Sequence, residues 1–271
     1  MTQRKSSGKR PHSDLTGGLV FQSCAVALEA EDEDDSRFTQ PSTSQVQRGM
    51  EKLTKSQIDE KTTELVQYFL VKDQKKIPVR RADIVKNVLK EYRNVFQEIM
   101  NRAQQCFEQV FGFKVVEIDA KNHVYILINK LEPADGGQMM SSNPKTGLLF
   151  VILSLVYMKG GVVPEVLVWN TLKKMQVDLK EKHPVFGDVK KLVTDEFVRQ
   201  RYLEYTKVPH TEPVKYEFTW GQRAEVEVSK LKILEFLGEL HSQDPKRWSQ
   251  QYKDASSQRS SMAPQPSTSS Q

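Results

Sequence analysis

Six basic residues in the second half of the chain have the side-chain chemistry and the spacing of phosphate contacts. They lie on an expected helix over residues 188–200 and on the aromatic hairpin that follows it: Lys190, Lys191, Arg199, Arg201, Lys207 and Lys215. Ammonium and guanidinium groups bind nucleic-acid phosphates in any sequence, and no row of Asn and Arg side chains is placed to read base edges. The pattern predicts duplex DNA binding that is indifferent to sequence and sensitive to salt. An ordinary solvated face explains the same charges equally well.

Residues that support catalysis or bind metals do not occur together in the sequence. His123, His183 and His210 are widely spaced, and no set of His, Cys and Asp has the spacing of metal ligands. Neither glycine pair, at 136–137 or at 160–161, is followed by the Lys-Ser/Thr of a phosphate-binding loop. We therefore expect a protein that is not an enzyme and that uses no metal or cofactor.

Composition limits the class of protein further. The chain has 271 residues, a formal net charge of +5 and two cysteines, Cys24 and Cys106, which are too few for a disulfide framework or a zinc site. Its most apolar run, residues 147–158, is shorter than the roughly 20 residues that a membrane span needs. These features are typical of a soluble intracellular protein.

Residues 197–224 carry the clearest local pattern. A helix end is followed by two short aromatic strands, with the Pro-flanked segment 208–213 as the turn between them. The aromatic residues of these strands are Tyr202, Tyr205, Tyr216, Phe218 and Trp220. A short hairpin docked behind a helix is typical of the wing of a winged-helix unit, a fold that binds duplex DNA or docks partner proteins.

The same order of elements is expected twice along the chain. Helix, short extended piece, helices and hairpin occur over residues 56–131 and again over 146–254, and the turn-rich segment 132–145 joins them. Charge blocks and Ser/Thr/Gln tracts bury too little apolar surface to fold, so residues 1–55 and 255–271 are expected to be disordered tails. The prediction is a mainly α fold with small β-hairpins (α+β), built as two tandem winged-helix units between these tails.

Ordered motifs along residues 60–250 resemble the MAGE homology domain. They lie at 72–79, 81–84, 124–129, 146–149, 198–205 and 216–224. Within the family, the first of these motifs, the Arg-Gln-Arg-Tyr version of 198–205 and the ending at 243–248 are most similar to the MAGE-type subunit of the SMC five–six chromosome-maintenance complex.

This resemblance implies tandem winged helices without a catalytic centre, a nuclear and chromosome-associated location, and work in recombinational DNA repair. It implies that a RING-type ubiquitin ligase subunit, non-SMC element 1, binds the first unit and is stimulated there. It also implies that the kleisin subunit, non-SMC element 4, binds the second unit, in a hetero-oligomer with SMC five, SMC six and duplex DNA.

Apolar residues on each unit are the candidate partner contacts. The RING-partner set is Leu65, Phe69, Leu70, Ile77 and Pro78, and the kleisin set is Phe218, Trp220 and Leu234. Neighbouring helical residues such as Phe69 and Leu70 point about 100° apart, so part of their stripe stays available to a partner. The alternative is that these side chains are buried within their own units. Gln222 stands where most relatives have proline, a departure at the start of the last helical region.

The alternative function is a stand-alone MAGE-type ubiquitin-ligase adaptor or transcriptional coregulator that does not bind DNA. A sequence-specific transcription factor is disfavoured because base-reading residues are missing from the expected helix.

Overall fold

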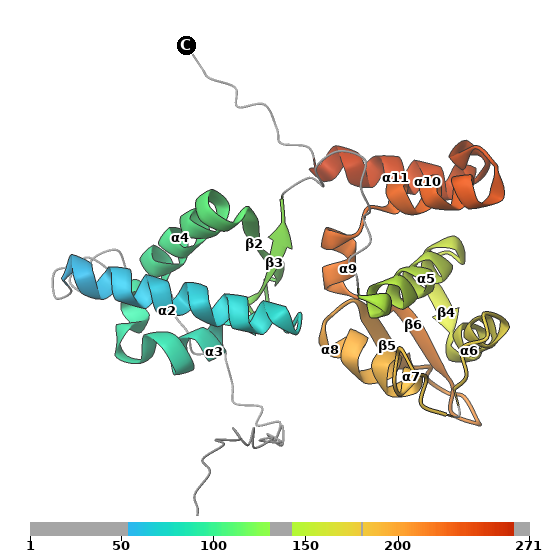
Figure 1. Cartoon of the computed structure of the whole chain (residues 1–271), viewed down its shortest axis with the longest axis horizontal. Helices are drawn as coiled ribbons and strands as arrows, with labels where there is room; N and C mark the ends of the chain where they lie inside the picture. The colour runs from blue at the N-terminus through green and yellow to red at the C-terminus, as the bar shows by residue number, and fades with distance from the viewer. Residues whose placement is uncertain (1–53, 131–142, 180, 263–271) are drawn as a thin grey trace, which may run out of the picture. The chain divides into compact units, whose positions relative to one another are not determined.

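The computed structural model describes residues 54–130, 143–179 and 181–262, with side chains as far as residue 258. Most of the predicted N-terminal tail, most of the predicted linker and residues 263–271 lie outside the described residues. Within them, residues 54–130 and 143–262 each carry a small sheet and a core, so the tandem winged-helix prediction is confirmed (Figure 1).

The first unit has the predicted order of helix, short strand, helices and hairpin. Its elements are α2 (Lys55–Gln74), β1 (Val79–Arg80), α3 (Arg81–Ile84), η2 (Val85–Leu89), η3 (Lys90–Val95), α4 (Phe96–Cys106), η4 (Phe107–Phe111), β2 (Phe113–Asp119) and β3 (Val124–Asn129). α2 begins at a capping box in which Thr54 and Gln57 exchange side-chain to backbone hydrogen bonds. Gly112, with φ of 66°, ends the last helical turn in a conformation that glycine adopts without strain.

The core of the first unit lies between its helices and its sheet. β1, β3 and β2 pair antiparallel in that order, with Val115 opposite Leu127. α2 packs on α4, and the Phe69 and Phe107 rings meet edge to face with centroids 5.7 Å apart. Fully buried aromatic pairs of this kind contribute about 0.5–1.5 kcal/mol beyond the area that they bury.

The second unit repeats the order and adds helices at its C-terminal end. Its elements are α5 (Pro144–Met158), β4 (Val162–Pro164), α6 (Glu165–Lys174), α7 (Val189–Lys191), η5 (Leu192–Glu196), α8 (Phe197–Arg199), β5 (Leu203–Lys207), β6 (Tyr216–Trp220), α9 (Gln222–Glu227), α10 (Lys230–His241), η6 (Pro245–Arg247) and α11 (Ser249–Met262). β4, β6 and β5 pair antiparallel in that order, which places β6 in the middle of the sheet.

α5 is the central helix of the second core. It starts at the Asn143 cap with Pro144 in its first turn, where the missing N–H of proline costs nothing. The helix is apolar almost all round, and Ile152, Leu153 and Val156 are buried. Its apolar run is therefore a core helix rather than a membrane span, as predicted.

Aromatic stacking reinforces the hairpin of β5 and β6. The Tyr205 ring stacks on Tyr216 with centroids 4.7 Å apart and planes at 15°, and it stacks on Phe218 at the same distance and 30°. Tyr205 and Phe218 are direct cross-strand neighbours. Cross-strand aromatic pairs are among the strongest contacts in small sheets, so this hairpin is held by its own side chains.

The predicted start of the C-terminal tail at residue 255 is wrong. α11 extends through that position to Met262, and Ala255 is 1% exposed. The polar composition suggested disorder, but this helix is held by the apolar contacts of Tyr252 and Ala255 and by hydrogen bonds to neighbouring helices. Pro164 is the last residue of β4 and occupies the N-cap position of α6.

Candidate functional site

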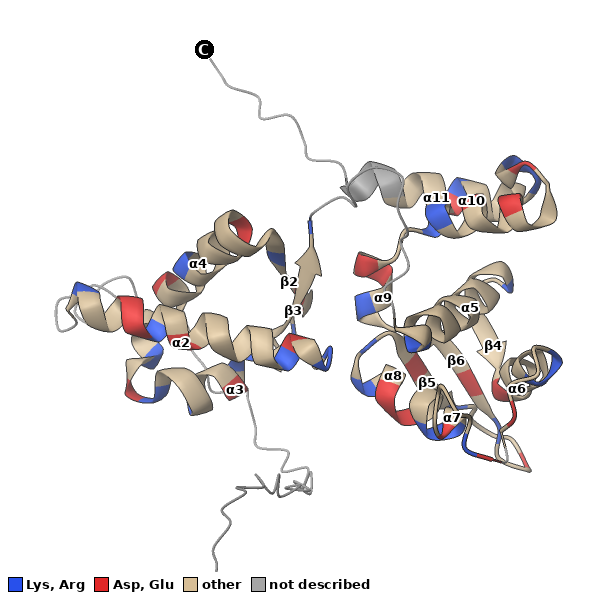
Figure 2. Cartoon of the chain, viewed as in Figure 1, with Lys and Arg blue, Asp and Glu red and all other residues tan. Residues whose placement is uncertain are grey.

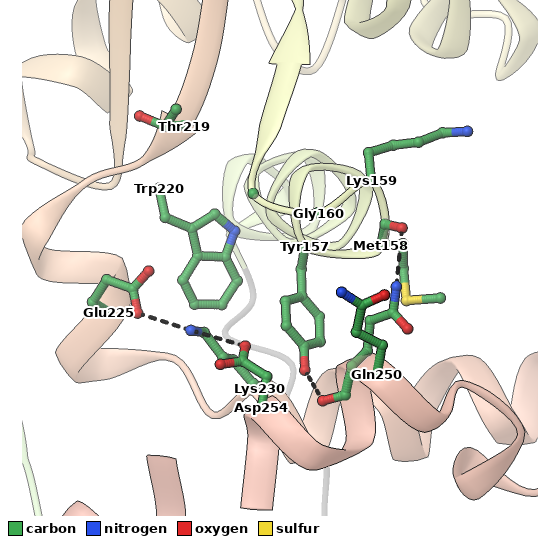
Figure 3. Close-up of a pocket in the computed structure, with 12 residues that line it drawn as sticks. Tyr157, Met158, Lys159, Gly160, Thr219, Trp220, Glu225, Lys230, Gln250 and Asp254 are labelled. Carbon is green, nitrogen blue, oxygen red and sulfur yellow. Dashed lines mark hydrogen bonds and ion pairs between the residues drawn. The ribbon is translucent and has the colours of Figure 1, made fainter. Parts of the chain in front are cut away.

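A pocket of about 610 Å³ opens between the end of α5, the sheet and α11. Tyr157 from α5 and Trp220 from β6 form its aromatic wall (Figure 3). Lys230, Glu225 and Asp254, from α10, α9 and α11, surround these rings with charge. Aromatic side chains in a pocket are frequent anchors for partner proteins, and convergent charged groups can orient what binds there.

Trp220 is held in this pocket by a hydrogen bond, by a ring contact and by the backbone of the residue that follows it. Its indole Nε1–H donates to the backbone oxygen of Leu153 at 2.9 Å, and its ring lies 5.9 Å from the Tyr157 ring, centroid to centroid. The next residue is Gly221, whose backbone passes so close to Arg201 that an added Cβ would lie 2.3 Å from the Arg201 oxygen. Only glycine permits this approach, which sets where β6 ends and α9 begins.

Lys230 is the central charge of the pocket. Its side chain is 15% exposed, and its Nζ forms ion pairs with Glu225 at 3.2 Å and with Asp254 at 3.3 Å. The same Nζ lies 5.6 Å from the Trp220 ring centre and 5.8 Å from that of Tyr157. A cation near two aromatic faces is attracted to both rings. Through these rings and its two ion pairs, Lys230 on α10 connects to α5, α9 and α11.

Tyr157 has an environment that opposes its ionisation. Burial raises the pKa of the Tyr157 hydroxyl to about 12, and the nearby carboxylate of Asp254 adds to the shift. The hydroxyl donates a hydrogen bond to the backbone oxygen of Gln251 on α11. Tyr157 therefore acts as a neutral donor that holds α11.

The basic residues predicted to contact phosphate lie in two groups. Lys190, Lys191 and Arg199 are exposed on α7 and α8, and Lys207 and Lys215 are exposed at the two ends of the hairpin loop, where Val208 N–H donates to the Lys215 oxygen at 2.9 Å. Arg201 is half-buried, and its backbone adopts a φ of 64° where the chain turns from α8 into β5.

Acidic residues are interleaved with the helical group. A second pocket, of about 350 Å³, is lined by Lys191 and Arg199 but also by Asp188, Asp195 and Glu196. Figure 2 shows basic and acidic segments alternating around α7 and α8. Asp188 has a structural role, because its carboxylate accepts from the Lys191 N–H and caps α7. The charges on this face are therefore mixed, and the hairpin is mixed as well, because exposed Glu212 lies in the loop between Lys207 and Lys215.

The RING-partner set divides into core and surface. Leu65 and Phe69 are 0% and 1% exposed and belong to the core of the first unit. Leu70, Ile77 and Pro78 are half-buried near the end of α2, where the Ile77 N–H donates to the Lys72 oxygen. Sequence reasoning missed Val71 beside them, which is 56% exposed. A contact through this set therefore depends on its last three members.

The kleisin set divides in the same way. Phe218 and Leu234 are each 0% exposed in the second core, and Trp220, at 8% exposed, belongs to the same core but also lines the pocket. Sequence reasoning missed Tyr157, Lys230 and α11 as parts of this surface. The signal available in the sequence was a tyrosine at the polar end of an apolar helix, a position that places its hydroxyl outside the core.

Metal and membrane sites are not evident in the described parts of the chain. No three His, Cys, Asp or Glu residues among them are grouped as metal ligands would be. No helix in these same ranges combines the length and the apolar character that crossing a membrane requires.

Comparison with known proteins gives matches over most of the chain. Non-structural maintenance of chromosomes element 3 homolog of Homo sapiens is 47% identical over 218 residues, which cover 79% of this chain and 72% of that protein. MAGE-like protein 2 of Homo sapiens is 49% identical over 202 residues, which cover 74% of this chain but 16% of that protein. A chain of the solved Nse1-Nse3-Nse4 complex is 53% identical and superposes with a TM-score of 0.71, covering 75% of this chain and 100% of that chain.

The family itself follows from the extent of these matches. Residues 65–231, more than half of the chain, match the MAGE homology domain. That segment starts within α2 and ends in the first turn of α10, so it spans both winged-helix units. The chain therefore belongs to the MAGE homology domain family.

Proposed function

We propose that this protein is a non-catalytic scaffold subunit of the SMC five–six chromosome-maintenance complex. The observation that carries the proposal is the 47% identity to the human element 3 homolog over 79% of the chain. The 53% identical chain in the solved Nse1-Nse3-Nse4 complex supports the same assignment. The proposed role places the protein in the nucleus, on chromosomes, in recombinational DNA repair.

The proposed partner of the first unit is the RING-type ubiquitin ligase subunit, non-SMC element 1, which this protein binds and stimulates. Leu70, Ile77 and Pro78 near the end of α2 are the proposed contacts, because Leu65 and Phe69 are taken up by the core. Exposed Val71 extends the apolar surface on the same turn. Leu70→Asp is expected to weaken this binding at least about tenfold, because a carboxylate is costly to bury in an apolar contact. Gln67→Asp, an equally acidic change at an exposed position of α2, is the matched control.

The proposed partner of the second unit is the kleisin subunit, non-SMC element 4. Trp220 is the proposed anchor, because large aromatic side chains in pockets dominate the energy of most interfaces. Phe218 and Leu234 support Trp220 from the core rather than touching the partner. The bridge from kleisin to SMC five and SMC six completes the proposed assembly.

The proposal includes sequence-indifferent contact with duplex DNA. Exposed Lys190, Lys191, Lys207 and Lys215 support it, because lysine ammonium groups suit phosphate oxygens. The acidic residues around α7 and α8 limit the strength of this contact. Its lysine–phosphate pairs make it depend on salt, because each neutralised phosphate releases counterions.

Affinity purification of the endogenous protein, with its partners identified by mass spectrometry, tests the proposal. Recovery of the RING-type subunit, the kleisin and both SMC proteins is the expected result. Recovery of none of them would contradict the proposal, whatever ligase or transcription factor appeared in their place.

The second candidate function is a stand-alone MAGE-type ubiquitin-ligase adaptor or transcriptional coregulator. The 49% identity to MAGE-like protein 2 favours it, because identity at the level of the domain does not separate the two roles. Purification with an unrelated ligase, together with no measurable affinity for duplex DNA, is the outcome that this candidate predicts.

A further inference from the structure

The last helix, α11, is seated on the second unit as a helical ligand would be. It packs beside α10 and reaches the end of α5 (Figure 1). Tyr252 packs on the core. The other contacts fall on one face of the helix, at Gln251, Asp254, Ala255 and Gln258. These positions are spaced i, i+3, i+4 and i+7, as in helices that bind grooves. Ser257 lies outside this face and is exposed.

One side chain of α11 pairs with backbone groups at the junction of α9 and α10. The Gln258 Nε2 donates to the Glu225 oxygen at 2.9 Å, near the end of α9. Its Oε1 accepts from the N–H of Lys230 at 3.1 Å, the first residue of α10. Helix ends leave such carbonyl and N–H groups unpaired, so a single amide here satisfies one acceptor and one donor.

Aromatic rings and a cation complete the groove. Tyr157 donates to the Gln251 oxygen, and Asp254 pairs at 3.3 Å with the Lys230 Nζ that lies against Trp220. Ala255 is 1% exposed, so its small side chain is enclosed where α11 meets the core of the second unit. The groove therefore selects a helix with an acidic residue, a small residue after it and an amide four residues after the acid.

α11 holds this groove mainly through polar contacts that a competitor can replace. Tyr252 and Ala255 are its apolar side chains in contact with the core. A helix of its 14 residues is marginally stable by itself in water. The segment that matches the MAGE homology domain ends at residue 231, before α11 begins. α11 thus lies outside the matched segment, which ends in the first turn of α10, and it contacts Tyr157 and Lys230 inside that segment.

We infer that this groove is a helix-docking site shared by α11 and a helix of the kleisin, which compete for it. The inference rests on the proposed kleisin contact at Trp220 and makes it specific. A kleisin helix reaches Trp220 when α11 has left, and it presents an acidic side chain to Lys230 in place of Asp254. With α11 gone, the Lys230 ammonium has lost the Asp254 carboxylate, so a helix that brings an acidic side chain there has the complementary charge.

Full-length variants that displace α11 test the groove without the partner. Ala255→Arg puts a long cation at the buried contact, and Asp254→Lys places a like charge opposite Lys230 at a residue whose side chain is 55% exposed. Ser257→Arg on the exposed side is the control. A fluorescent peptide of residues 247–262 is expected to bind both variants about tenfold or more tightly than it binds the control, whose own α11 fills the groove. Absence of peptide binding to Asp254→Lys, with wild-type melting and circular dichroism, would overturn the inference.

Titration of the kleisin subunit into the same full-length proteins tests the partner. The displaced variants are expected to bind it about tenfold more tightly than the wild type and Ser257→Arg, because no helix has to leave first. Equal affinity for all of them would overturn the inference and leave the proposed function standing. Failure of every variant and of the wild type to bind kleisin would contradict the proposed function, and the peptide experiment would still decide whether α11 occupies a docking groove.

Discussion

The ammonium group of Lys230 lies 5.6 Å from the centre of the Trp220 ring. Lys230 is in the first turn of α10, and Trp220 is the last residue of β6. Two carboxylates, one from α9 and one from α11, hold this ammonium group in place at 3.2 and 3.3 Å. A charged residue so placed links β6, the central strand of the sheet, to the three helices α9, α10 and α11. The pair is therefore the natural position at which to perturb the pocket.

Replacing Lys230 is expected to loosen α11 and to lower stability. Lys230→Ala removes the cation over two rings and leaves Glu225 and Asp254 facing each other, so we expect a loss of about 1–2 kcal/mol in the free energy of unfolding. Urea denaturation followed by tryptophan fluorescence measures it. Lys232→Ala, an exposed lysine on the same helix, is the control and is expected to change stability by less than about 0.5 kcal/mol. Equal effects of the two changes would contradict the role given to Lys230.

Glycine-to-alanine changes at two sites are expected to have opposite signs. Gly221→Ala forces its Cβ to 2.3 Å from the Arg201 oxygen, a backbone atom that cannot rotate away, so we expect a loss of more than about 2 kcal/mol. Gly147→Ala in α5 meets nothing within 4 Å and is expected to stabilise the protein by about 0.4–1 kcal/mol. Thermal unfolding of both variants measures the difference, and a stable Gly221→Ala protein would refute the close approach.

Charge reversal tests the proposed DNA-binding surface. Lys190, Lys191 and Lys207 changed together to Glu are expected to weaken duplex binding at least about tenfold at low salt, and similarly for unrelated sequences. The slope of log affinity against log salt is expected to fall by roughly 2–3, about 0.9 for each phosphate that is no longer neutralised. Lys173, Lys174 and Lys182, also exposed, changed together to Glu give a control of equal net charge. If both triple variants bind equally well, the contact surface lies elsewhere.

The Tyr157 hydroxyl predicts a dependence of stability on alkaline pH. Its pKa is raised to about 12 in the folded protein and is about 10 in the unfolded chain, so the folded state keeps a proton that the unfolded state releases between these values. Unfolding therefore becomes easier as pH rises from 10 towards 12, by up to about 1–3 kcal/mol from this group. Tyr157→Phe is expected to flatten this part of the wild-type profile, measured by urea unfolding at pH 9–11. Identical slopes for the two proteins would show that Tyr157 is not protected.

The order of the elements was predictable because the spacing of apolar residues and the positions of Gly and Pro turn residues indicate the same elements in both units. The hairpin that ends the first unit is an example, since Gly112 before the strand over 113–119 and a turn after it mark both ends of that strand. The exposure of single side chains was harder to predict. Leu65, Phe69, Phe218 and Leu234 lie on apolar stripes that a sequence cannot divide into core and surface, because burial depends on which helix packs over them.

The pocket under α11 shows a second limit of sequence reasoning. Composition favoured disorder after residue 255, because serine and glutamine contribute little apolar area. Gln258 is ordered because two helix ends happen to present a free donor and a free acceptor at the same place. This arrangement joins residues that are far apart in the sequence, so no local sequence pattern predicts it.

The stack of Tyr205 on Tyr216 and Phe218 has a consequence for how quickly the hairpin can engage any partner. Stacked rings restrict the hairpin to few backbone conformations. A partner that encounters it therefore usually finds it in the conformation that binds. Little freedom remains to be lost when it docks, and encounter rather than rearrangement then limits the rate. The aromatic residues that mark this segment in the sequence thus preorganise the hairpin for binding.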